Sequence, residues 1–240
     1  MKKLIFFILL LATAQLFAQP WKSIKGDGQL KKETRALSEF SSISSRGSIE
    51  VKITKGQPGK IEVEADENLL PYIETNVENG KLIIQTKKNI NIKSASKMVV
   101  YVNMTLIKSL QVSGSGNIDA NGIFKGDDAS EFIVSGSGNI HFSSASFKNV
   151  SFSISGSGNI TAKGGSADDL SVSVRGSGNV YVSDISAENV EAKISGSGNT
   201  KVSASKSLSA NISGSGNIFY QGNATDISSK VNGSGKLIKG

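Results

Sequence analysis

The segment VSFSISGSGNITA at residues 150–162 contains the pattern that decides the fold. Apolar residues alternate with Ser before the word SGSGNI, at Val150, Phe152 and Ile154, and the alternation resumes after it at Ile160. A spacing of two places these side chains on one face of a β-strand, because successive side chains of a strand point to opposite sides. The segment is therefore predicted to form two strands that meet at the glycine-rich word.

The same word recurs along the C-terminal half of the chain. Its versions begin at Ser113, Ser135, Ser155, Arg175, Ser195, Ser213 and Asn232. Successive starts lie 22, 20, 20, 20, 18 and 19 residues apart. A fixed period of this length is typical of solenoid proteins, whose repeats bury a core only by stacking on their neighbours. The sequence thus predicts an all-β protein, a parallel β-helix with about 20 residues per coil and a less regular, β-rich N-terminal part.

The glycines and the asparagine of each word are predicted to have structural roles. Counting from the flanking apolar residues, both glycines point inward, where a Cβ would collide with the opposite wall of a pinched tube. The asparagine is expected to turn the chain, since it tolerates left-handed backbone, and to form a ladder of stacked amides. The structural turn and ladder residues are Gly114, Gly116, Asn117, Gly136, Gly138, Asn139, Gly156, Gly158, Asn159, Gly176, Gly178, Asn179, Gly196, Gly198, Asn199, Gly214, Gly216 and Asn217.

The residue after each GNI-type word points outward, which predicts one surface column that varies along the stack. The column reads Asp119, His141, Thr161, Tyr181, Lys201 and Phe219. Exposed aromatic side chains offer flat apolar area with little entropy to lose on binding. The candidate ligand-binding residues are therefore Tyr181, Lys201, Phe219 and His141. The alternative is that these side chains only stack across strands or lie beneath the N-terminal segment.

The first residues have the layout of a secretory signal peptide. Lys2 and Lys3 precede an apolar run, and small residues follow at Ala14 and Ala18, either of which could mark the cleavage site. We expect a signal peptide at 1–18, irregular β coils or hairpins of the same solenoid at 19–110, and the regular repeats at 111–240. The alternative for 19–110 is a separate N-terminal β domain. No second hydrophobic span follows, so no transmembrane segment is expected in the processed chain.

Composition excludes several classes of chemistry. With no Cys and one His, the chain lacks the residues for the usual zinc sites and for Ser-His or Cys-His nucleophile systems. We predict no catalytic residue, no cofactor and no metal. We interpret the acid pairs at Asp127–Asp128 and Asp168–Asp169 as solvated turn residues in preference to a calcium site. The net charge of +7 lies on scattered lysines without interleaved aromatics, so nucleic acid is not an expected partner.

The repeated words, together with Phe40-Ser41-Ser42-Ile43 and Gly80-Lys81-Leu82-Ile83-Ile84, resemble the head GIN domain family of autotransporter adhesins. The resemblance extends from about Arg35 to Gly235. It implies a right-handed parallel β-helix and export to the periplasm or the outer surface of a Gram-negative cell, and the signal peptide is similar to those of Bacteroidetes.

The function expected from these features is that of a non-enzymatic envelope or surface protein, an adhesin or binding module that contacts glycans or proteins. One alternative is a periplasmic component of envelope assembly or stress response that binds another protein. A β-helix enzyme acting on polysaccharides is a further alternative, but it would need an acidic cluster beside a basic residue, and Arg175 is the only Arg within the regular coils.

Overall fold

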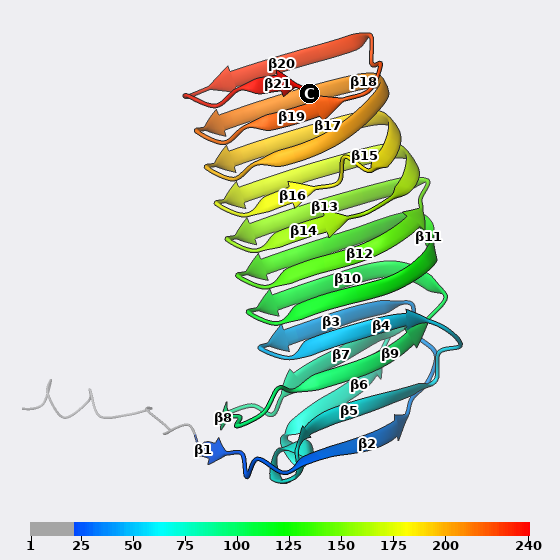
Figure 1. Cartoon of the computed structure of the whole chain (residues 1–240), viewed down its shortest axis with the longest axis vertical. Coiled ribbons are helices and arrows are strands. Elements are labelled where there is room, and N and C mark those ends of the chain that lie inside the picture. The colour runs from blue at the N-terminus through cyan, green and yellow to red at the C-terminus, as the bar shows by residue number, and fades with distance from the viewer. Residues whose placement is uncertain (1–21) are drawn as a thin grey trace, which may run out of the picture.

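The chain folds as a parallel β-solenoid with a less regular N-terminal end, as the sequence predicts (Figure 1). The structure is a computed structural model that describes residues 22–240; the expected signal peptide at 1–18 lies outside the described residues. The stack has about 7 turns. Hydrogen-bonded rungs of neighbouring coils are 22, 20, 20, 20, 18 and 19 residues apart, which is the period of the repeated word.

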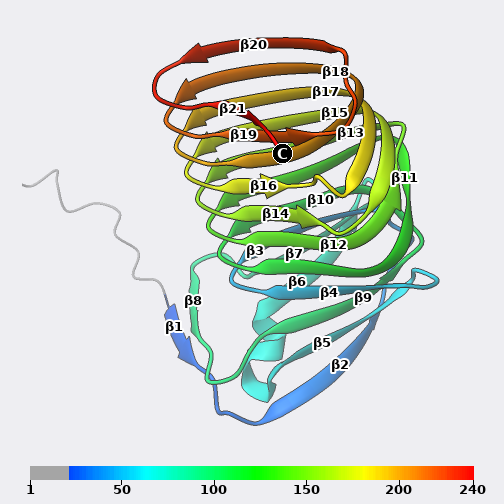
Figure 2. The same ribbon diagram turned by 45° about the horizontal axis from the view of Figure 1, so that its top comes forward.

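Two walls of parallel strands face each other across the core, and the word SGSGN forms the corner between them. The first wall is made by β3 (Ser42–Gly47), β10 (Leu106–Gly114), the end of β11 (Asn117–Gly136), β13 (Asn149–Gly156), β15 (Gly165–Gly176), β17 (Ile185–Gly196), the end of β18 (Thr200–Gly214) and β20 (Asp226–Asn232). The second wall is made by β4 (Glu50–Lys55), the start of β11, β12 (Asn139–Ser146), β14 (Asn159–Ala162), β16 (Asn179–Tyr181), the start of β18, β19 (Ile218–Gln221) and β21 (Leu237–Lys239). Figure 2 shows β11 curving around the edge from one wall to the other.

Inward side chains of successive coils stack in register and form one continuous core. Phe132 pairs with Phe152 on the first wall, and their ring centroids are 5.1 Å apart. Phe142 reaches Phe132 from the second wall at 4.7 Å. Such aromatic pairs add about 0.5–1.5 kcal/mol beyond the area that they bury. The alternation of apolar residues in the sequence therefore places the core between the two walls.

The corner glycines are crowded first of all by the backbone of the preceding coil. A Cβ on Gly156 would lie 2.3 Å from the carbonyl oxygen of Gly136, and one on Gly158 would lie 2.0 Å from that of Gly138. Both oxygens belong to the preceding coil, so the closest crowding acts along the stack. At Gly158 crowding also acts across the core, because the added Cβ would lie 2.6 Å from Val134 Cγ1 of the first wall. Gly156 also has a φ of 133°, a backbone conformation that L side chains rarely adopt.

This close approach lets one carbonyl accept two hydrogen bonds from the next coil. The oxygen of Gly136 accepts from the backbone N–H of Ser157 at 2.9 Å and from that of Gly158 at 3.1 Å. The same forked arrangement is repeated at the carbonyls of Gly47, Gly114, Gly156, Gly176 and Gly196. The corner thus satisfies backbone donors that would otherwise be left over where the strands end.

The N-terminal end of the stack is closed by antiparallel strands. β7 (Lys81–Thr86) and β9 (Val99–Met104) continue the two walls in parallel beneath β3 and β4. Below them β6 (Ile73–Glu78), β5 (Lys60–Asp66) and β2 (Leu30–Ala36) pair antiparallel, and the 3-10 helix η2 (Glu67–Tyr72) buries Leu69 and Leu70. This cap covers apolar side chains and strand edges that a bare coil would expose.

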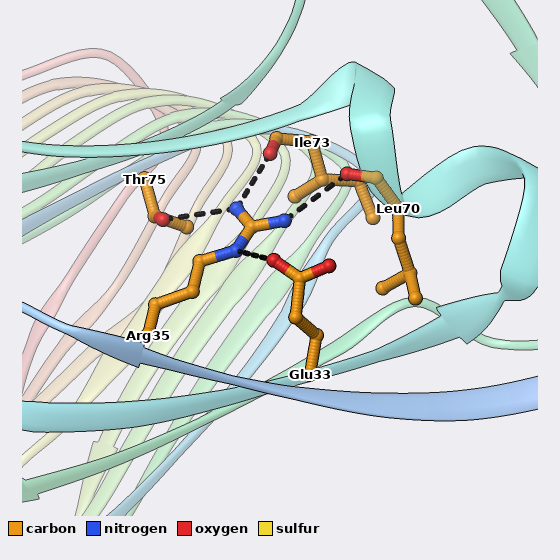
Figure 3. A network of polar contacts seen from close by, with 5 residues as sticks. All are labelled: Glu33, Arg35, Leu70, Ile73 and Thr75. Carbon is orange, nitrogen blue, oxygen red and sulfur yellow. Dashed lines mark hydrogen bonds and ion pairs between the residues drawn. The ribbon is translucent and has the colours of Figure 1, made fainter.

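Arg35 of β2 holds the cap together (Figure 3). Its Nη1 donates to the carbonyl oxygen of Ile73 at 2.7 Å and to Thr75 Oγ1 at 3.0 Å, and its Nη2 donates to the carbonyl of Leu70 at 3.1 Å. Nε completes the set with Glu33 at 2.7 Å. One guanidinium therefore connects β2 to η2 and β6.

The C-terminal end carries no such cap within the described chain. Every residue of β20 is exposed, including Ile227 at 39% and Val231 at 44%. These two residues continue the inward columns of Leu208 and Ile212. The last coil therefore presents core positions to solvent.

The corner geometry gives a direct test of stability. We expect Gly156→Ala to lower the free energy of unfolding by about 2–5 kcal/mol, because the new Cβ meets the Gly136 carbonyl and the backbone has positive φ. Urea unfolding followed by circular dichroism measures the change. Ser157→Ala is the control, since Ser157 is exposed at the same corner. Equal losses of stability in the two variants would contradict the axial-crowding explanation.

Candidate functional site

The predicted outward column is a continuous line of register partners on the second wall. Asp119 pairs with His141, His141 with Thr161, and Thr161 with Tyr181. Tyr181 then pairs with Lys201, and Lys201 with Phe219. Partners in adjacent strands are about 4.8 Å apart. The structure thus brings the predicted residues onto one surface, each from a different coil.

Tyr181, Lys201 and Phe219 form a stack in which the lysine lies between two aromatic rings. Lys201 Nζ is 5.4 Å from the ring centroid of Tyr181 and 5.9 Å from that of Phe219. Each cation–π contact at an exposed position contributes about 0.5–1 kcal/mol. Lys201 is exposed and both rings are half-buried. The predicted alternative of cross-strand stacking therefore describes part of this contact, and it leaves ring area and an ammonium group open to solvent.

Two hollows lie along the column. The first has a volume of about 330 Å³ and is lined by Asp119, His141, Thr161, Asn121, Lys52 and Lys163, among others. The second has a volume of about 240 Å³ and is lined by Lys201, Phe219, Tyr220, Gln221, Ser183, Val202 and Gly240. His141 belongs to the first hollow, whereas Lys201 and Phe219 belong to the second. The four candidate binding residues therefore share one surface without converging on one pocket.

Next to the first hollow, β11 has one more residue than the paired segment of β12. The register of β11 and β12 shifts between Ala120 and Ile123, where the chain bulges. The bulge leaves Ile123 68% exposed. β-Bulges redirect side chains locally, and the bulged segment includes Asn121, which lines the hollow.

The asparagines of the word form a side-chain ladder along the corner. Asn159 Nδ2 donates to Asn139 Oδ1 at 2.8 Å, and Asn179 Nδ2 donates to Asn159 Oδ1 at 2.9 Å. Equivalent bonds join Asn117 to Asn139, Asn179 to Asn199 and Asn199 to Asn217. The expectation that these asparagines turn the chain in left-handed backbone is wrong. Among the described non-glycine residues, only Asn79 and Asn89 have positive φ; in each word the positive φ is at the first glycine, such as Gly156, three residues before the asparagine.

Sequence reasoning missed the largest of these hollows, a groove on the first wall. It has a volume of about 510 Å³ and runs across five coils. Two columns line it: Glu131, Ser151, Ser171, Glu191 and Ser209 on one side, and Ala129, Asn149, Asp169, Asn189 and Ser207 on the other. The recurrence of Asn or Asp near every twentieth position was the available signal.

The corner beside this groove is held by polar contacts between coils. Asn189 Nδ2 donates to Asp169 Oδ1 at 3.0 Å, and Ser207 Oγ donates to Asn189 Oδ1 at 2.9 Å. Lys206 bonds Glu188 at 2.6 Å, and this hydrogen bond raises the pKa of Lys206 above its ordinary value. Many hydrogen-bonding side chains of this corner are therefore already paired within the protein.

The described residues offer little reactive chemistry. No group of three or more His, Asp or Glu side chains within residues 22–240 is arranged to hold a metal ion. Asp127 Oδ1 accepts the backbone N–H of Asp128 at 2.9 Å, and its Oδ2 lies 3.7 Å from Lys108 Nζ. Both acid pairs lie within strands, β11 and β15, and not in separate turns; Asp127 is half-buried and the other three acidic residues are exposed.

Comparison with protein families identifies the repeat. The sequence profile described as "Putative auto-transporter adhesin, head GIN domain" matches residues 39–224, which is most of the chain. The chain belongs to this family. The matched head GIN domain includes the regular coils up to β19 and the cap elements from β5 to β9. Comparison with functionally curated proteins found no significant match.

Solved structures resemble this head GIN protein over almost its whole length. A putative adhesin from Bacteroides fragilis has a TM-score of 0.81 at 19% identity and covers 90% of this chain and 99% of its own. A putative adhesin from Parabacteroides distasonis has a TM-score of 0.73 at 26% identity, covering 91% of this chain and 100% of its own. A protein from the same organism described as a putative lipid binding protein has a TM-score of 0.78 at 29% identity, with the same coverage of 91% and 100%.

Family membership supports a surface or binding protein at the level of the family, and it fits an exported protein. The description of the family as an adhesin suggests a non-enzymatic role. Within the part of the chain that the structure describes, no helix has the length and hydropathy needed to span a bilayer.

The amide ladder gives a second test of stability. We expect Asn159→Ala to lower the free energy of unfolding by about 1–3 kcal/mol, because it leaves the side-chain donor of Asn179 without its acceptor. Thermal or urea unfolding measures this change. Asn211→Ala is a matched control, since Asn211 is exposed on the first wall. An Asn159→Ala protein as stable as the control would show that the ladder adds nothing to the fold.

Proposed function

We propose that this head GIN protein is a non-enzymatic, adhesin-like module that binds carbohydrate through the Tyr181–Lys201–Phe219 stack. The observation that carries the proposal is the exposed lysine held between two half-buried aromatic rings on three successive coils. Aromatic rings offer flat apolar area, and an ammonium group offers three donors beside it. This combination suits a sugar ring, which has an apolar C–H face and a rim of hydroxyl groups.

The shape of the surface favours an extended ligand over a small enclosed one. The hollow at Lys201 and Phe219 has a volume of only about 240 Å³, less than the roughly 300–1,000 Å³ of a typical small-molecule pocket. The column continues to His141 and Asp119, which line the other hollow. A glycan chain lying along the stack would meet new side chains at every coil, about 4.8 Å apart.

An enzymatic role has less support. Glycoside hydrolysis needs two carboxyl groups that flank one bond, and Asp119 is the sole acidic residue that lines either hollow of the column. Binding without turnover requires only the contacts described above. The adhesin descriptions of the family and of its solved neighbours agree with this role.

The test replaces Tyr181, Lys201 and Phe219 together by Ser. We expect at least a tenfold loss of binding on a glycan array and in adhesion to glycan-coated surfaces, because both the stacking area and the ammonium donor are removed. Only a modest decrease in melting temperature is expected, since the column faces outward. The control variant replaces Glu191, Lys193 and Asn211 by Ser on the first wall and should keep its binding.

The two variants also separate carbohydrate from protein ligands. Loss of attachment to a surface protein, with no glycan recognised by the unmodified chain, would replace the carbohydrate proposal with a protein-binding one. Unchanged binding by the Tyr181, Lys201 and Phe219 variant would overturn the choice of this surface altogether.

A further inference from the structure

A small ribbon lies outside the main sheet at the N-terminal end of the solenoid (Figure 1). It consists of β1 (Lys22–Lys25) and β8 (Ile90–Lys93), which form a two-stranded parallel sheet of their own. Ile24 pairs with Ile92, and Ile92 packs against the core of the cap. One face of the ribbon therefore rests on the body of the protein.

Polar contacts fix the ribbon where it leaves that face. Asp66 lies at the end of β5, and its Oδ2 accepts from the backbone N–H of Ala95 at 2.9 Å and from Ser94 Oγ at 3.3 Å. Burial raises the pKa of Asp66, but hydrogen bonds from Ser96, Ala95 and Ser94 outweigh it and leave the pKa below its ordinary value. Asn68 Nδ2 donates to the carbonyl of Lys25 at 2.8 Å. The two strands are thus held at both the β1 and β8 ends.

The ribbon concentrates positive charge. Lys22 and Lys25 of β1 are exposed, and so are Lys88 and Lys93 on the second strand and the turn before it. The backbone N–H of Lys22 bonds the carbonyl of Asn89, next to Lys88, at 3.0 Å. None of these four ammonium groups forms an ion pair with a carboxylate of residues 22–240.

Neighbouring carboxylates and an aromatic ring offset only part of the positive charge of the ribbon. Lys87 lies 5.8 Å from the ring centroid of Tyr72, and Lys97 is 3.7 Å from Glu50. Two carboxylates near the ribbon have partners of their own: Asp27 accepts from the backbone N–H of Gln29, and the buried Asp66 accepts from that of Ala95. The ribbon therefore keeps a net positive charge after these partners are counted.

Lys25 and Lys93 are direct register partners. Like charges on neighbouring strands repel, so this pairing is unfavourable unless anions outside the protein lie near it. Lys22 and Lys25 are three residues apart, roughly 10 Å along an extended strand, and alternation points their side chains to opposite faces of the ribbon. One small anion cannot neutralise both positions, whereas a surface that bears many anions can contact both along the edge of the ribbon.

We propose that this ribbon attaches the N-terminal end of the solenoid to an anionic lipid bilayer by contacting phosphate-bearing headgroups. Clusters of four or more lysines bind such surfaces, and the attraction decays over a Debye length of about 8 Å at physiological salt. The interaction uses headgroup charge and leaves the acyl chains in the bilayer. It is separate from the proposed carbohydrate surface, whose Lys201 and Phe219 lie in coils near the opposite end of the stack.

The test is vesicle co-sedimentation with the full sequence expressed, exported and purified after processing. Vesicles of phosphatidylcholine alone are compared with vesicles that also contain phosphatidylglycerol. The test variant replaces Lys22, Lys25, Lys88 and Lys93 by Gln. The charge-matched control replaces Lys163, Lys230, Lys236 and Lys239, which are exposed and unpaired within residues 22–240.

We expect binding to the anionic vesicles, weak or absent binding to phosphatidylcholine, and release by added sodium chloride. The ribbon variant should bind at least tenfold more weakly, whereas the control and the Tyr181, Lys201 and Phe219 variant should bind as the unmodified protein does. If the ribbon variant unfolds, the double variant Lys25→Gln/Lys93→Gln replaces it, with Lys236→Gln/Lys239→Gln as its control.

Equal weakening in the ribbon variant and its control would overturn the proposal, because net charge alone would then explain attachment. Binding that is unchanged in the ribbon variant, or absent from anionic vesicles, would also overturn it. Release by millimolar inorganic phosphate at constant ionic strength would point to a soluble phosphate ligand in place of the bilayer.

Discussion

The structure depends on one contact, the carbonyl oxygen of each corner glycine that accepts two N–H groups from the next coil. The fork at Gly136 requires the backbones of Ser157 and Gly158 to approach so closely that a Cβ on either neighbouring glycine would overlap an oxygen. Because the fork fixes the position of each corner relative to the one before, it aligns the strands that leave that corner. Farther from the corner the register shifts at bulges, as between Ala120 and Ile123.

Register turns each position of the repeat into a column on the surface. One column can then hold the aromatic and lysine stack at Tyr181, Lys201 and Phe219, while the asparagine column remains constant and structural. A substitution in the first kind of column alters the surface of one coil. A substitution in the second removes contacts with both neighbouring coils, so the two kinds of column have different freedom to vary.

Alternation and period were enough to predict the solenoid, its coil length, the core face and the members of the outward column. They did not predict the direction in which the glycines are crowded, because alternation tells which side a residue faces and not how near the next coil lies. The cap lacks the repeated word, so the antiparallel pairing of β2 with β5 had no periodic signal. The ribbon of β1 and β8 joins segments far apart in sequence, and only the fold reveals that Lys25 lies beside Lys93.

The dipoles of the side-chain amides in the ladder are aligned along the stack. Every Nδ2 in it donates toward the N-terminal end and every Oδ1 faces the C-terminal end, so the side-chain dipoles add instead of cancelling. Hydrogen bonds in such a chain polarise one another. The negative pole lies at Asn217, whose Oδ1 accepts the backbone N–H of Lys236 at 3.1 Å. A lysine thus occupies the rung where another asparagine would continue the series, and its side chain has no oxygen to offer to a further coil. The ladder of side-chain amides therefore ends at Asn217, and the next residue in its column is the positively charged Lys236.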